Sequence, residues 1–70
     1  MDKVGLEVAM LRKGVTNTQV ADMLKISNMA LYNKKNGVSE FKESEIRKIV
    51  EYLDLSSEEI NDIFFIKKVN

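Results

Sequence analysis

Residues 16–37 read TNTQVADMLKISNMALYNKKNG, and this stretch decides the expected fold. Thr16 and Gln19 form a T-x-x-Q capping box, in which each side chain satisfies a free backbone donor at the start of a helix. Ser27 is a second N-cap and begins another helix, expected over residues 28–35. The stretch therefore predicts two short helices joined by a tight turn.

Three further helices are expected outside this stretch. One runs over about residues 2–13 and stops at Gly14 in a left-handed conformation. Apolar residues spaced i, i+3, i+4 and i+7 predict another over about residues 43–53. The capping box of Ser56 with Glu59 opens the last helix. The side chains expected in the core are Leu6, Met10, Val20, Ala21, Leu24, Leu31, Ile46, Ile49, Val50, Leu53, Ile60 and Ile63, with the aromatic residues Phe41, Tyr52 and Phe64.

The composition excludes several classes of protein. The 70 residues suffice for one domain, expected over residues 1–70, and the absence of proline favours an all-α fold with short connections. There is no cysteine and no histidine, so neither a thiolate metal site nor the commonest general base is present. No P-loop and no glycine-rich turn after a strand occurs. We therefore expect a protein that is not an enzyme and binds no metal or cofactor.

The hydropathy pattern gives an expected location. No apolar run approaches the roughly 18 residues of a membrane span, and no charged and then apolar leader opens the chain. We therefore expect a cytoplasmic protein without a membrane segment.

The charges are balanced in number but not in position. Basic and acidic residues number 11 each, which is a weak count for a nucleic-acid binder. Residues 1–39 carry six basic and three acidic side chains, whereas residues 40–70 carry five and eight. A charge asymmetry of this kind can present one cationic face on a neutral protein.

The helix expected over residues 28–35 is unusually rich in side chains that form hydrogen bonds. Asparagine is only a middling helix former, and three asparagines fall within nine residues here. An asparagine amide offers a donor and an acceptor together, the pair that matches adenine in the major groove. The structural alternative is that Asn28 belongs to the helix cap, and that Asn36 and Gly37 end the helix because both tolerate positive φ.

These motifs resemble the lambda-repressor and Cro-like regulators, the Xre-type family, including prophage-encoded members from Gram-positive bacteria. The matching elements are Val15-Thr16, the packing pair Val20-Ala21, the turn residues Leu24 and Ile26-Ser27, the end Asn36-Gly37, and the closing Ile63-Phe64-Phe65. The resemblance implies a compact five-helix lambda-repressor-like DNA-binding domain with a helix-turn-helix at residues 16–37. It implies a sequence-specific transcriptional regulator, a repressor or Cro-like protein, that binds double-stranded DNA.

The resemblance also implies residue roles. The base-reading positions are Asn28, Met29, Tyr32 and Asn33, and the phosphate-contacting positions are Asn17, Thr18, Lys34, Lys35 and Asn36. The expected partner is a palindromic operator bound by a homodimer, with no small-molecule effector.

The sequence departs from the family pattern in three places. Lys25 replaces the turn glycine, and a lysine there must adopt a left-handed conformation at a cost of about 1 kcal/mol. Met10 and Lys35 occupy the positions where many members have a paired Arg and Glu. We therefore expect that this internal ion pair is absent and that Lys35 is free to face DNA. Asn17 stands in place of a longer glutamine.

The C-terminal residues 65–70 offer an interface. An exposed apolar patch there is the candidate dimer contact, formed by Phe65, Ile66 and Val69. Its presence, with the neutral net charge, motivates an alternative function. In that reading the chain is a protein-interaction module, such as an antitoxin or an anti-repressor, that uses the same fold.

Overall fold

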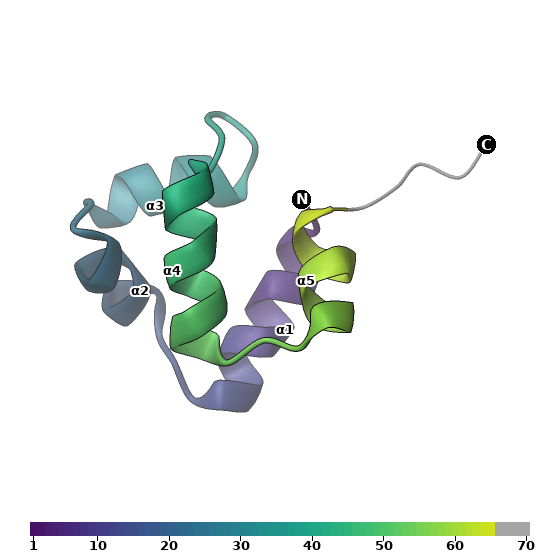
Figure 1. The fold of residues 1–70 in the computed structure, drawn as a ribbon. Helices are drawn as coiled ribbons and strands as arrows, with labels where there is room; N and C mark the ends of the chain where they lie inside the picture. Colours follow the sequence, from purple (N-terminus) through teal and green to yellow (C-terminus); the bar gives the residue numbers. More distant parts are fainter. Residues whose placement is uncertain (66–70) are drawn as a thin grey trace.

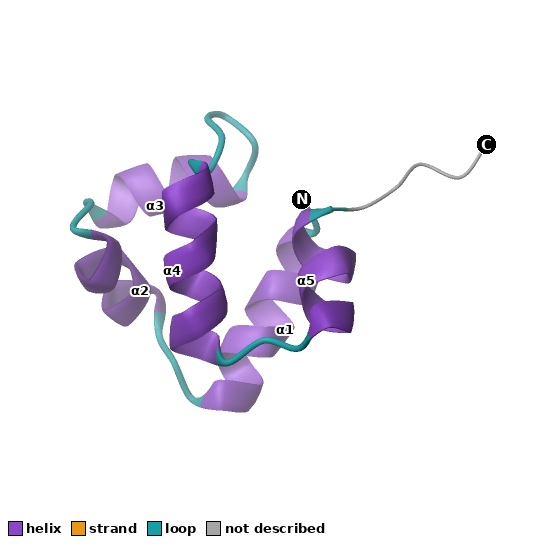
Figure 2. Ribbon diagram, in the orientation of Figure 1, coloured by secondary structure: helices purple, strands orange, loops and turns teal. Residues whose placement is uncertain are grey.

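The computed structural model describes residues 1–65 of the chain. Within this range it is all-helical, with five α-helices and no strand (Figure 1, Figure 2). The helices follow the predicted positions: α1 Lys3–Lys13, α2 Asn17–Leu24, α3 Asn28–Lys35, α4 Glu43–Leu53 and α5 Ser57–Phe64.

Local hydrogen bonds explain where the first two helices begin. The N–H of Gly5 donates to Asp2 Oδ1 over 3.0 Å, so Asp2 caps α1. The capping box of α2 is confirmed, since the N–H of Gln19 donates to Thr16 Oγ1 at 3.1 Å and the N–H of Thr16 donates to Gln19 Oε1 at 2.8 Å. Gly14 ends α1 with φ of 69°, as expected.

The turn between α2 and α3 is tight and contains a strained lysine. Lys25 has φ of 60° and ψ of 42°, in the left-handed region, as the sequence predicts. The N–H of Ile26 donates to the carbonyl of Ala21 at 3.0 Å and closes the turn. Ser27 then caps α3, with its Oγ accepting from the N–H of Ala30 at 3.0 Å.

The helices pack around one apolar core. α4 stands between the α2–α3 pair and the α1–α5 pair (Figure 1). α1 packs against α4 and α5, while α2 packs against α3 and α4. The buried apolar residues are Leu6, Ala9, Met10, Val20, Ala21, Leu24, Leu31, Ile49, Leu53, Leu55 and Ile63.

Some predicted core residues lie at the edge of this core. Ile46, Val50, Ile60, Phe41 and Phe64 are only partly buried. Phe41 and Phe64 meet edge to face, with ring centroids 6.2 Å apart.

One core prediction is wrong. Tyr52 was expected in the core but is 43% exposed, because it lies about 100° round the helix from buried Leu53. Asn36 and Gly37 end α3 as predicted, and of the two it is Gly37 that has positive φ, at 80°, while the φ of Asn36 is −95°. The Asn36 side chain contributes to this helix end, since its Nδ2 donates to the carbonyl of Tyr32 at 2.7 Å.

Among the helices of residues 1–65, none combines the length and hydropathy needed to cross a membrane. Of the candidate dimer contacts, Phe65 is exposed, while Ile66 and Val69 lie outside the described residues.

Candidate nucleic-acid interface

The outer face of α3 carries the predicted base-reading residues. Met29 and Tyr32 are 66% and 60% exposed, and Asn28 is also exposed. Asn33 is half-buried. Ser27, not Asn28, caps the helix, so the capping alternative does not account for Asn28 at the first position of α3.

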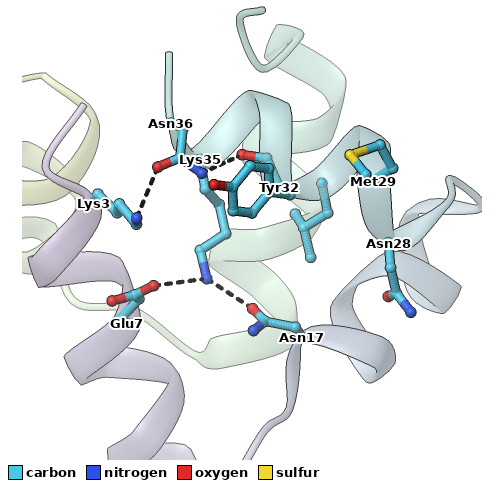
Figure 3. A pocket seen from close by; sticks show the side chains of 9 residues that line it. Lys3, Glu7, Asn17, Asn28, Met29, Tyr32, Lys35 and Asn36 are labelled. Atoms are coloured by element: carbon cyan, nitrogen blue, oxygen red, sulfur yellow. Dashed lines mark hydrogen bonds and ion pairs between the residues drawn. The ribbon is translucent and has the colours of Figure 1, made fainter. Parts of the chain in front are cut away.

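Lys35 is not free, which corrects the sequence-based expectation. It is only 6% exposed. Its ammonium lies 3.3 Å from Glu7 Oε2 on α1 and donates to Asn17 Oδ1 on α2 at 2.7 Å (Figure 3). An internal ion pair is therefore present, but its charges are reversed relative to the family's pair: the cation is Lys35 on α3, and the carboxylate is that of Glu7, three residues before Met10 on α1. A buried cation needs such partners to offset its lost hydration.

The ammonium of Lys34 is also paired within the protein. Its ammonium lies 3.2 Å from Glu45 Oε1 on α4 and donates to the carbonyl of Glu40 at 3.2 Å. Neither lysine at the end of α3 therefore presents an unpaired charge to a ligand.

Both the oxygen and the nitrogen of the Asn36 amide form hydrogen bonds within the protein. Its Oδ1 accepts from Lys3 Nζ at 2.7 Å, and its Nδ2 caps the carbonyl of Tyr32 (Figure 3). The structural alternative, that Asn36 belongs to the end of the helix, is confirmed. Asn17 and Thr18 are exposed in the first turn of α2.

Many of these side chains line one open hollow of about 470 Å³ between α1, α2 and α3. It contains six of the nine positions predicted to contact bases or phosphates, whereas Thr18, Asn33 and Lys34 do not line it. Its floor includes buried Leu31. The lining residues are Lys3, Glu7, Asn17, Asn28, Met29, Leu31, Tyr32, Lys35 and Asn36 (Figure 3).

The sequence profile of a family described as a protein of unknown function (DUF739) matches residues 2–67. The chain belongs to the DUF739 family. No curated protein and no solved structure matches the chain.

In this DUF739 protein, Glu45 joins α3 to the start of α4. Burial alone would raise the pKa of Glu45, but the N–H of Lys42, which donates at 2.8 Å, and the ammonium of Lys34 together hold it below its usual value. The carboxylate is therefore ionised at neutral pH, where it both caps α4 and fixes Lys34.

The chemistry available in the hollow of this DUF739 protein is that of hydrogen bonding and apolar contact. Residues 1–65 contain no cluster of three or more His, Cys, Asp or Glu side chains that could hold a metal ion. What the hollow and the adjoining face of α3 offer is amide, phenol and thioether groups on exposed positions.

Proposed function

We propose that this DUF739 protein is a sequence-specific, double-stranded DNA-binding regulator, in which α2 and α3 act as a lambda-repressor-like helix-turn-helix. The observation that carries the proposal is the exposed face of α3, where Asn28, Met29 and Tyr32 follow directly on a tight turn. A helix that only packs needs no such face, and these groups suit base edges in a major groove.

The internal pairing of the two lysines refines the proposal. Because Lys34 and Lys35 are held by carboxylates of the same chain, the phosphate contacts expected of these two lysines fall to other donors. Asn17 and Thr18 in the first turn of α2 are in this position, where backbone N–H groups and the helix dipole also favour an anion. Binding through such neutral donors releases fewer counterions than binding through the two lysines would, so the salt dependence is shallower.

The test is a selection of bound DNA from a random duplex pool. A regulator of this type enriches a palindromic consensus whose half-sites are about one helical turn apart. The matched control replaces the exposed Asn28 and Tyr32 by alanine, which leaves the core intact and should abolish the enrichment. If the original protein enriches no sequence, the proposed function is wrong.

A second function is favoured by a separate feature. Phe65 is 55% exposed and lines an apolar groove of about 600 Å³ beside α4, with Ile46, Val50 and Ile60. Such a groove suits a protein partner, as in an antitoxin or anti-repressor. A stoichiometric protein partner that co-purifies with the chain, together with no enriched DNA, would favour this function over the first.

A further inference from the structure

Lys35 is a buried cation that holds three helices together. It comes from α3, and its two partners come from α1 and α2 (Figure 3). A second bond runs beside it, from Lys3 Nζ to Asn36 Oδ1 at 2.7 Å. Lys3 and Glu7 lie one turn apart on α1. The C-terminal end of α3 is therefore tied to α1 by two neighbouring side chains.

The bond from Lys35 to Asn17 has a chemical consequence for the amide. A lysine ammonium has donors and no acceptor, so the Asn17 atom that faces it at 2.7 Å is the oxygen. The two ends of an amide are often ambiguous, but a donor-only partner removes that ambiguity. The Nδ2 group, which carries two N–H donors, is left on the opposite side of this exposed residue (Figure 3).

We propose that Lys35 is a positioning residue that acts through Asn17, orienting its amide so that the N–H donors face a DNA phosphate. This inference rests on the proposed DNA-binding function and deepens it. Lys35 does not meet the phosphate itself, because it is 6% exposed and would have to break both of its bonds. The carboxylate of Glu7, 3.3 Å from the Lys35 ammonium, balances the charge of this buried side chain.

A double-mutant cycle tests this role. The variants are Lys35→Met, Asn17→Ala and the double variant, and the measurement is the affinity for the selected duplex. Lys35→Met should weaken binding about tenfold in the original protein, as expected for a lost hydrogen bond to DNA. It should have little further effect when Asn17 is already alanine. If the factor by which the double variant loses affinity equals the product of the factors for the two single variants, the inference is overturned.

The salt dependence separates positioning from direct contact. When the logarithm of the affinity is plotted against the logarithm of the salt concentration, each phosphate that a lysine neutralises contributes about −0.9 to the slope. Lys35→Met should leave the slope unchanged, and a slope shallower by about 0.9 would show direct contact and overturn the inference. Lys35→Arg keeps a donor-only cation and should restore binding, which also controls for a folding defect in Lys35→Met.

A measurement without DNA distinguishes failure of this inference from failure of the proposed function. The ¹⁵N relaxation of the Asn17 side-chain amide should show an ordered group in the original protein and in Lys35→Arg, and a mobile one in Lys35→Met. An amide equally mobile in all three proteins overturns the positioning role, whether or not DNA binds. An ordered amide in a protein that enriches no DNA overturns the proposed function and the role of the amide at a phosphate.

Discussion

The Lys34 ammonium lies 3.2 Å from the Glu45 carboxylate, and this ion pair joins the end of α3 to the start of α4. Both side chains are largely shielded from solvent, at 13% and 11% exposure. The same carboxylate accepts the N–H of Lys42 and so begins α4. A single acid thus orients the proposed reading helix and caps its neighbour.

Glu45 should make the free energy of unfolding depend on pH in the acid range. Its pKa is lowered in the folded protein, so its contribution is fully present above the ordinary carboxyl value of 4.5 and is lost as pH falls through the lower folded value. We expect Glu45→Gln to lower the urea concentration at the midpoint of unfolding at pH 7. The difference in midpoint between this variant and the original protein should shrink as the pH falls below 4.5.

The matched control for this prediction is Glu43→Gln. Glu43 pairs with Arg47 at 3.3 Å, but both side chains are strongly exposed, and such pairs contribute little. A shift of the midpoint as large as that of Glu45→Gln would contradict the role assigned to Glu45.

Lys25→Gly should stabilise the protein. Lys25 is left-handed, with φ of 60°, and glycine adopts this conformation without the steric cost of a Cβ. Part of the gain is lost because glycine has greater freedom in the unfolded chain. We therefore expect the free energy of unfolding, measured with urea, to rise by about 0.5–1 kcal/mol. Lys25→Ala keeps the Cβ and should give no gain; an equal gain would trace the effect to the lysine side chain instead.

Asn28→Ala should reduce specific DNA binding by about 1–3 kcal/mol and relax the preference at one base position. Asn28 is exposed at the start of α3, so the fold should be unaffected. Binding to the selected duplex and to single-base variants of it would measure both effects. Asn61→Ala, an exposed asparagine on α5, is the control and should bind as before.

Phe65→Ser should weaken any self-association of the protein. Phe65 is 55% exposed beside the groove on α4, and removing an exposed aromatic from an interface typically lowers affinity. Sedimentation equilibrium over a range of concentrations would measure the shift toward monomer. Tyr52→Ser, at another exposed aromatic of α4, serves as the control. A dimer unchanged by Phe65→Ser would place the contact elsewhere.

The helices were predictable because their signals are short-range. The capping boxes at Thr16 and Ser56 and the stop at Gly14 act within a few residues, and each appears where the sequence predicts it. The left-handed conformation of Lys25 followed from the family resemblance, in which this position of the turn is a glycine. Tyr52 was misplaced because its type favours burial, whereas its position round α4 decides its exposure.

The candidate site was predictable in part. The exposed positions Asn28, Met29 and Tyr32 followed from the helical period of α3 and the capping serine before it. The pairing of Lys35 was missed because only Met10 was considered as its partner on α1. The acid at Glu7, one turn earlier on the same helix, was the available signal.

The sequence by itself determined the number, order and starts of the helices in residues 1–65, because caps and apolar periodicity act over one or two turns. Only the tertiary structure decided what the two lysines at the end of α3 do. Lys34 meets Glu45 on α4, and Lys35 meets Glu7 on α1 and Asn17 on α2. These partners come from other helices, and packing, which local pattern does not encode, brings them within bonding distance.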